Sequence, residues 1–242
     1  MTTFGIENYL PHLSIDCVIF GYQKKQLKVL VSKFKFGKDL WGLPGGYILK
    51  TESIEKAANR ILKERTDLND IFLEQFRVFG SEDRIVSSQT NEMLKKEWSA
   101  FDPVKFDQAT IDWMTGRFVC IGFYALVDID KVNPQPGDLE EFLEWKNVEE
   151  LGALTHDHTE IVLTALDTLR RNLDQKLIGF NLLPEYFTMK EVQELYETVY
   201  DRTFPMNNFQ KKMLSLGVLV RMEKKFTGAQ NKAPYLYRFV PK

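Results

Sequence analysis

A glycine-rich turn followed by an amphipathic helical pattern constrains the fold of this chain more than any other sequence feature. The run WGLPGG at 41–46 predicts a tight loop, because glycine and proline favour turns. Apolar and charged residues then recur at helical spacing over 53–66. Two strand-like runs, at 14–22 and 27–34, precede the loop. This order of elements predicts a layered α+β or α/β domain.

The turn and the helix together carry a spaced pattern of glycine and charged residues. The segment GYILKTESIEKAANRILKERTDL, from Gly46 to Leu68, resembles the Nudix box of diphosphate hydrolases, written G-x5-E-x7-R-E-U-x-E-E-x-G-U with U aliphatic. The positions that agree are Gly46, Glu52, Arg60, Leu62, Glu64 and Leu68. The resemblance implies a Nudix-type mixed-sheet α/β/α sandwich. The alternative for residues 53–66 is a plain amphipathic helix with solvated charges, and the preceding loop and strands favour the Nudix interpretation.

Two positions that are acidic in the Nudix pattern hold other residues here. A Nudix helix binds divalent metal through carboxylates on one face, and positions 61, 64, 65 and 68 would share that face. Ile61 removes one metal ligand, and Arg65 adds a permanent positive charge that can pair with a phosphate or a carboxylate. We therefore predict a pocket with no catalytic residue and no metal. Magnesium is expected only if the chain is an active hydrolase.

Cysteine usage and the apolar runs indicate a soluble cytoplasmic protein. The 242 residues suffice for one large or two modest domains without disulfide support. Cys17 and Cys120 both lie in apolar strand-like runs, which favours buried, reduced thiols. The longest apolar run, 118–127, is too short to cross a bilayer, and the N-terminus lacks a signal-peptide pattern. No membrane partner is therefore expected.

Charge is distributed unevenly along the chain. The net charge of the whole chain is −2. Residues 202–242 hold nine basic residues against Glu223 alone, a net charge of +8, so the rest of the chain carries −10. An acidic body with a basic end indicates a polyanionic partner for that end.

Residues 1–176 are expected to form the Nudix-like sensor domain. Further elements are predicted as strands near 71–80, 117–128 and 142–145 and as a closing helix at 157–173. Residues 85–116 form an insertion, with helix-like pieces near 91–98 and 105–114. A lid, a dimerisation element and a surface excursion are all compatible with this insertion.

Residues 177–242 follow the plan of a winged helix domain. Thr188 begins a capping-box pattern at the start of a helix expected over 189–200. After a proline-containing turn, Asn207 is expected to cap a second helix that closes at Gly217. Two strands and a turn-rich loop between them complete the plan, and they are predicted over 218–226 and 235–240.

The polar residues of this second domain suit DNA. In helix-turn-helix proteins the second helix enters the major groove, where asparagine, glutamine and lysine can contact bases and phosphates. The candidates on that helix are Asn207, Asn208, Gln210, Lys211 and Lys212. The candidates on the wing are Lys224, Lys225, Gln230, Asn231 and Lys232. The alternative is a winged helix that contacts proteins, and the charge of +8 favours double-stranded DNA.

A degenerate Nudix domain followed by a winged helix resembles the Nudix-related transcriptional regulators of bacteria, over nearly the whole chain. These regulators use an inactive Nudix domain as the sensor, and the resemblance implies a ligand-responsive homodimer that binds a palindromic operator. Known members sense ADP-ribose or a related nucleotide, whereas Bacteroidetes relatives respond to sugars such as arabinose. The GFNLLPEYFT junction and the NNFQKKM helix are most similar to the sugar-responsive branch.

The effector pocket is expected around the former catalytic cleft. The candidate ligand-binding residues are Trp41, Arg60, Glu64, Arg65, Glu82, Asp83 and Arg84. Each has a plainer alternative, which is a surface ion pair or, for Trp41, a place in the core. His156 and His158 have a spacing seen in metal sites, but no third ligand is nearby, and helix capping by Thr155 or Asp157 explains the segment.

Two other functions are compatible with the sequence. One is an active Nudix hydrolase of ADP-ribose or another nucleoside diphosphate derivative. The other is a protein-binding adaptor, which would have no salt-sensitive affinity for DNA. The effector, the operator and the choice between repression and activation are left open.

Overall fold

The chain folds into two compact units. The computed structural model describes residues 4–69, 71–84, 92, 95–97, 100, 102, 106–176, 179, 182–225 and 233–240. The first unit lies within 1–21 and 28–169, and the second within 22–27 and 170–242. The tip of an N-terminal hairpin therefore belongs to the same unit as the C-terminal part of the chain. The expected domain boundary after residue 176 stays a prediction.

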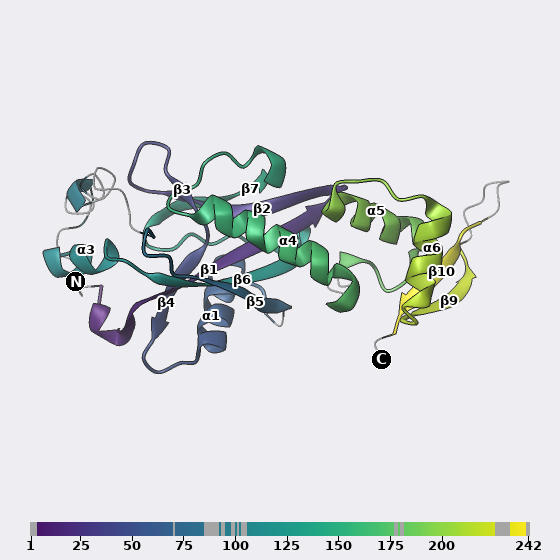
Figure 1. Ribbon diagram of the computed structural model, residues 1–242, viewed down its shortest axis with the longest axis horizontal. Helices are drawn as coiled ribbons and strands as arrows, with labels where there is room; N and C mark the ends of the chain where they lie inside the picture. Colours follow the sequence, from purple (N-terminus) through teal and green to yellow (C-terminus); the bar gives the residue numbers. More distant parts are fainter. Residues whose placement is uncertain are drawn as a thin grey trace. The chain divides into compact units, whose positions relative to one another are not determined.

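A mixed sheet forms the centre of the first unit (Figure 1). Among the described residues seven strands pair in the order β3-β2-β1-β6-β5, with β4 on β1 and β7 on β2. Their bounds are β1 Tyr9–Gln23, β2 Gln26–Phe34, β3 Trp41–Gly42, β4 Gly45–Leu49, β5 Leu73–Phe79, β6 Val119–Asp128 and β7 Glu140–Asn147. The expected loop at 41–46 contains two strand ends instead, because Gly42 pairs with Ser32 of β2 and Gly45 with Asp16 of β1.

Helix α1 follows the glycine-rich turn, as predicted. Ser53 caps it by accepting a hydrogen bond from the Lys56 amide, and Asp67 ends it in the left-handed conformation, with φ of 60°. The helices of this unit with both ends in the described residues are α1 (Ile54–Thr66), α3 (Gln108–Met114) and α4 (His158–Lys176, which continues into the second unit). The 3-10 turns described there are at Ile6–Asn8, Ile129–Lys131 and Val148–Glu150. Among the described residues no helix is both long and apolar enough to cross a membrane.

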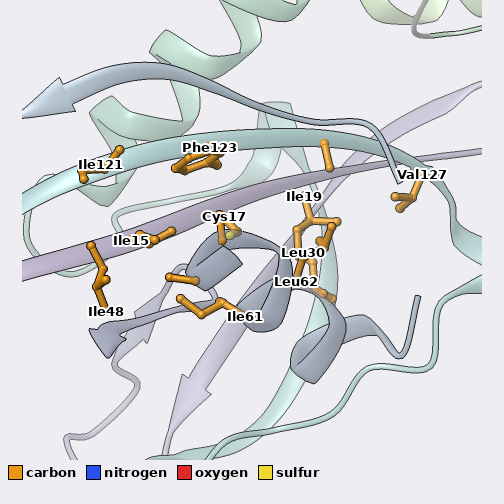
Figure 2. Close-up of a cluster of buried hydrophobic side chains, with 13 residues drawn as sticks. Ile15, Cys17, Ile19, Leu30, Ile48, Ile61, Leu62, Ile121, Phe123 and Val127 are labelled. Atoms are coloured by element: carbon orange, nitrogen blue, oxygen red, sulfur yellow. The ribbon is translucent and has the colours of Figure 1, made fainter. Parts of the chain in front are cut away.

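Alternate residues of the central strands face α1 and form a core with it (Figure 2). Ile15, Cys17 and Ile19 of β1 are fully buried there, and Ile61 and Leu62 of α1 are almost fully buried. Burying one such side chain contributes roughly 1.5–3 kcal/mol, so this contact rather than helix propensity stabilises α1.

The other face of the sheet is buried as well. Val18 and Phe20 of β1 alternate with the residues facing α1 and are also fully buried. The apolar side of α4, with Ile161, Ala165 and Leu169 fully buried, supplies the other cover, and Figure 1 shows α1 and α4 on different sides of the sheet. The unit is therefore the α/β/α sandwich that the sequence predicts.

The C-terminal part of the predicted insertion packs against the body of this unit. Asp107 caps α3 by accepting a hydrogen bond from the Thr110 amide at 2.8 Å. Ile111 and Met114 of α3 pack against Phe36 and Phe106. Of the helix-like piece predicted near 91–98, the structure describes residues 92 and 95–97, which are helical, and the rest lies outside the described residues.

The second unit contains the predicted winged helix. Its elements are β8 (Phe187–Thr188), α5 (Met189–Tyr200), α6 (Met206–Ser215), β9 (Leu219–Lys224) and β10 (Tyr235–Phe239), with the strands in the order β8-β10-β9. The capping box of Thr188 and Glu191 is present. The expected cap at Asn207 is wrong, because the helix starts earlier and Pro205 occupies the N-cap position. Strand β8, which is only two residues long, has no sequence pattern that predicts it.

Candidate functional site

A pocket of about 450 Å³ lies in the first unit. Its wall takes side chains from β1, β2, β4, α1 and α3, and from the segments that lead into β7 and α4. The volume is in the range of small-molecule sites. Aromatic and charged residues both line it, so it can hold a ligand that is partly apolar and partly hydrogen-bonding.

Aromatic rings gather around Tyr47 of β4. Its ring centroid lies 4.6 Å from that of Trp113, 5.3 Å from that of Phe118 and 5.7 Å from that of Tyr9. Rings at these distances hold one another in defined orientations. Burial raises the pKa of Tyr47, so its hydroxyl stays protonated. This part of the wall is therefore rigid and suits the flat or apolar face of a ligand.

Asp16 places a buried carboxylate in the β1 wall. Its Oδ2 lies 3.5 Å from Nε2 of His158 and 3.5 Å from Nη2 of Arg84. The same oxygen accepts a hydrogen bond from the Cys120 thiol, with 2.9 Å between the sulfur and the oxygen. A carboxylate that is only 10% exposed requires such partners, because an unpaired buried charge is costly.

His158 is held in one tautomer. Its Nδ1 accepts a hydrogen bond from the Leu43 amide at 3.0 Å, so the ring proton is on Nε2 and faces Asp16. Burial lowers the pKa of His158. Burial, together with the neighbouring His158, lowers the pKa of His156, which also lines the pocket. Both rings are therefore neutral near neutral pH.

Arg84 connects three elements at the pocket. Its Nε donates to Oδ2 of Asp157 at 2.8 Å, and its Nη1 donates to the carbonyl oxygen of Phe118 at 3.0 Å. With Asp16 as the third partner, the guanidinium joins β1, the start of β6 and the start of α4. It is a fixed cation whose charge is balanced by carboxylates.

Arg60 ties α1 to the segment that precedes it. Its Nη2 donates to Oε1 of Glu52 at 2.7 Å and to the carbonyl oxygen of Tyr47 at 2.9 Å, and its Nε donates to Oε2 of Glu52 at 3.1 Å. The hydrogen bonds from Arg60 lower the pKa of Glu52. Nη1 lies 3.3 Å from Glu64, whose side chain is 47% exposed. The Nudix-like spacing of glutamate and arginine thus produces a bidentate pair.

Arg65 pairs with a carboxylate that the sequence analysis did not single out. Its Nε lies 3.3 Å from Oε2 of Glu140, at the start of β7, and its Nη2 donates to the carbonyl oxygen of Gly45 at 3.2 Å. Oε1 of Glu140 accepts a hydrogen bond from the Ser32 hydroxyl at 2.9 Å. The guanidinium is therefore fixed between α1, β4 and β7.

The residues on this face do not fit a divalent metal site. Ile61 is 1% exposed and belongs to the core, and Arg65 brings a cation among the nearby oxygens. No three His, Cys, Asp or Glu side chains of the described part of the chain are arranged to hold a metal. The metal of a Nudix hydrolase would neutralise phosphates and activate water, and the carboxylates for that chemistry are missing.

The structure brings together most, but not all, of the predicted ligand-binding residues. Arg60, Glu64, Arg65 and Arg84 line the pocket, whereas Trp41, Glu82 and Asp83 do not. Trp41 instead has the ammonium of Lys146 3.2 Å from its ring centroid, and its Nε1 donates to Asp39. Ligand binding by these residues stays a prediction.

Sequence reasoning missed several residues of the wall. Asp16 carried a usable signal, because a charged residue inside the apolar run SIDCVIF is unusual in a buried strand. Glu140 carried none, since it lies in a polar stretch. Helix capping by Thr155 or Asp157, the expected role of this segment, does not explain the contacts of His158, whose Nδ1 accepts a hydrogen bond from the Leu43 amide. The carboxylate of Asp157 accepts a hydrogen bond from Arg84.

In the second unit, α6 exposes part of the predicted DNA-binding set. Asn207, Asn208 and Lys211 are exposed, and Gln210 is half-buried. The ammonium of Lys212 lies 2.6 Å from Oδ2 of Asp174, so this lysine is already engaged in an ion pair. Contact with DNA stays a prediction for all of them.

On the wing, Lys224 and Lys225 are exposed. Lys225 lies 3.9 Å from Glu191, a separation too long for a hydrogen bond. The guanidinium of Arg221, absent from the predicted set, stacks 3.3 Å from the ring centroid of Tyr235. Gln230, Asn231 and Lys232 lie outside the described residues.

Comparison with known proteins matches both units. Residues 10–166 match the NUDIX domain family, and residues 179–239 match the family described as the NrtR DNA-binding winged helix domain. The chain is 24% identical to the ADPR responsive transcriptional repressor NtrR of Acinetobacter baylyi over 235 residues, which are 95% of this chain and 82% of that protein.

Two solved structures share the fold over nearly the whole chain. Shewanella oneidensis NrtR complexed with a 27mer DNA is 24% identical, with a TM-score of 0.67 and coverage of 94% of this chain and 93% of that one. A MutT/nudix family protein from Enterococcus faecalis is 21% identical, with a TM-score of 0.66 and coverage of 95% and 86%. At these identities the likeness shows the fold alone.

Proposed function

The chain belongs to the Nudix family through residues 10–166 and carries an NrtR-type winged helix domain at 179–239, and on this basis we propose that it is a ligand-responsive transcriptional regulator. In this proposal the Nudix domain senses a small molecule and the winged helix binds operator DNA. One observation carries it. The pocket of about 450 Å³ is present, but a position that is acidic in the Nudix pattern is occupied by Arg65, which pairs with Glu140. Such a pocket can recognise a ligand without hydrolysing it.

The charges of the pocket support an uncharged effector rich in hydroxyl groups, such as a sugar. The described arginines of its wall are each paired with a carboxylate, Arg60 with Glu52, Arg65 with Glu140 and Arg84 with Asp157. A diphosphate would compete with those carboxylates, whereas hydroxyl groups can donate to exposed carboxylate oxygens. An ADP-ribose-like nucleotide is the second candidate, because the Acinetobacter baylyi relative is named as ADPR responsive.

The second unit supports binding of DNA in the major groove. Asn207, Asn208 and Lys211 are exposed on α6, the second helix of the winged helix, and residues 202–242 carry a net charge of +8. We propose that two copies of the chain bind a palindromic operator in the cytoplasm. The effector would change the separation of the two winged helices, which must match major grooves about 34 to 36 Å apart.

Binding of the purified chain to its own upstream DNA, compared with scrambled DNA over a salt series, tests this function. We expect specific affinity that falls steeply with salt and that changes on saturation with arabinose or ADP-ribose. Absence of specific binding would contradict the DNA-binding part. Unchanged operator affinity with both effectors would contradict the sensing of either one.

Single substitutions on α6 separate base recognition from charge attraction. Lys211→Ala should reduce the slope of log affinity against log salt by about one, because one phosphate contact is lost. Asn208→Ala should cost about 1–3 kcal/mol of discrimination at one base pair. Lys56→Ala, at an exposed lysine of α1 in the other unit, is the matched control and should leave both quantities unchanged. Equal effects of Lys56→Ala and Lys211→Ala would contradict the assignment to α6.

The hydrolase alternative makes an opposite prediction about turnover. Magnesium-dependent release of phosphate products from ADP-ribose, lost on Glu64→Gln, would establish it. We expect no such turnover, because Ile61 and Arg65 remove the carboxylates that would hold the metal.

A further inference from the structure

We propose that Arg65 is the resident cation of the Nudix pocket, with its guanidinium in the place where a hydrolase of this family would bind a divalent metal. The proposal rests on the Nudix assignment and on the contacts of Arg65. It shares with the proposed function the observation that Arg65 replaces an acidic residue, but its test needs neither the effector nor the operator. Operator binding that changes with an effector would therefore support the regulatory function even if this proposal failed.

The contacts of Arg65 are made with oxygen atoms. Its Nε lies 3.3 Å from Oε2 of Glu140, and its Nη2 lies 3.2 Å from the carbonyl oxygen of Gly45. Carboxylate and carbonyl oxygens are the ligands that hard divalent cations prefer. Glu64, one residue before Arg65, also lines the pocket. The guanidinium therefore lies among the kinds of atom that a metal would use.

Glu140 is held in place by further hydrogen bonds. The Ser32 hydroxyl donates to its Oε1 at 2.9 Å, and the Gly137 amide donates to its Oε2 at 2.5 Å. The Glu140 side chain is 6% exposed. A carboxylate this deep needs a nearby positive charge, and among its described contacts Arg65 supplies it.

The guanidinium of Arg65 also packs tightly against Gly137, in the segment that leads into β7. A Cβ atom added at Gly137 would lie 2.6 Å from Nη2 of Arg65, closer than real contacts allow. The backbone of the same segment is attached to the end of α1, since the Gln135 amide donates to the carbonyl oxygen of Arg65 at 3.0 Å. A metal ion would thus have to displace Arg65 against both steric exclusion and charge repulsion.

Titration with Mn²⁺, followed by the paramagnetic resonance signal of the free ion, tests this assignment. The wild-type chain should show no binding at the pocket, and Arg65→Lys, which keeps the charge, should behave the same way. Arg65→Glu should bind Mn²⁺ at least roughly tenfold more tightly than wild type, because a charge reversal converts repulsion into attraction. Adding Glu140→Gln to Arg65→Glu should remove that gain. Mn²⁺ should raise the melting temperature of Arg65→Glu but not that of the wild-type chain or of Arg65→Lys.

Two results would overturn the proposal. One is Mn²⁺ binding by the wild-type chain that is lost on Glu140→Gln, since the metal would then coexist with Arg65. The other is a folded Arg65→Glu chain with no gain in affinity, which would leave Arg65 as an ordinary structural ion pair. If Arg65→Glu does not fold, Arg65→Gln takes its place, because it removes the cation without adding a buried charge. A folded Arg65→Gln chain should also gain affinity for Mn²⁺, and no gain would again overturn the proposal.

Discussion

At the scale of single residues, the pocket fixes the protonation of His158 through its two ring nitrogens. One accepts from the Leu43 amide, and the other faces Asp16. Burial lowers the pKa of His158 below its ordinary value of 6.5, and the attraction of Asp16 offsets only part of this effect. His158 therefore takes up a proton at a lower pH in the folded chain than in the unfolded chain.

This linkage predicts that acid destabilises the sensor domain. As the pH falls below about 6.5, the unfolded chain gains a proton at this histidine before the folded chain does, so the free energy of unfolding decreases. Urea denaturation at about pH 7 and about pH 5 measures the decrease. His158→Asn keeps an acceptor for the Leu43 amide without a titrating group, and it should show a weaker pH dependence. An unchanged pH dependence in that variant would contradict the assignment.

Local pairs of site residues could be predicted from the sequence, and distant ones could not. Glu52 and Arg60 are eight positions apart in one spaced motif that the sequence reveals, and they form a bidentate pair. Asp16, Arg84 and His158 come from three distant segments that only the sheet brings together. A single sequence carries periodicity and turn signals but no information on which strands become neighbours.

At the scale of elements, the β1–β2 hairpin has a turn that does not match its residues. The two residues between the strands, Lys24 and Lys25, have φ of 48° and 63°. Two-residue hairpin turns with both φ positive favour asparagine and glycine, because a Cβ atom is strained in this conformation. The turn therefore carries a conformational cost.

Replacing Lys24 by glycine should relieve part of that cost. We expect Lys24→Gly to stabilise the chain by up to about 1 kcal/mol and to raise the melting temperature by about 2–4 °C. Lys24→Ala, which removes the charge but keeps the Cβ atom, separates strain from electrostatics and should give no such increase. Equal melting temperatures for Lys24→Gly and Lys24→Ala would show that strain at this residue is negligible.

Long periodic elements were easier to predict than short ones. The capping box at Thr188 and the apolar spacing behind it gave the start of α5 correctly. The two-residue strand β8 was missed, because it forms by pairing Phe187 with Tyr237 of β10 and lacks a pattern of its own. The sequence pattern places the start of α6 too late, because Asn207 is a typical cap residue, whereas Pro205 occupies the N-cap position in the structure.

At the scale of the whole molecule, most of β1 and β2 belongs to the first compact unit, whereas the tip of their hairpin belongs to the second. Residues 22–27 belong to the unit that contains the winged helix. Within that unit the ammonium of Lys25 lies 2.9 Å from Glu194 of α5, and the Tyr22 side chain lies near Glu194 and Thr198 of the same helix. Sequence patterns assign the hairpin to the first domain, because they follow the order of the chain rather than its contacts.

Loss of the contact with α5 should loosen the hairpin tip alone. In full-length Glu194→Ala, amide hydrogen exchange at 22–27 should become faster, while exchange at 15–19 in the core should stay slow. Glu223→Ala, at an exposed glutamate of the same unit, is the control and should leave both segments unchanged. Unaltered exchange at 22–27 in Glu194→Ala would show that the ion pair does not hold the tip.

The β1–β2 hairpin, whose tip belongs to the second unit, affects where two related chains can be joined to make a chimera. A chimera joined at a single point near residue 170 would combine the hairpin of one parent with the α5 of another. Lys25 and Tyr22 would then meet foreign side chains in place of Glu194 and Thr198. Exchange of DNA-binding modules between related chains should therefore succeed most often when residues 22–27 are transplanted together with the C-terminal module.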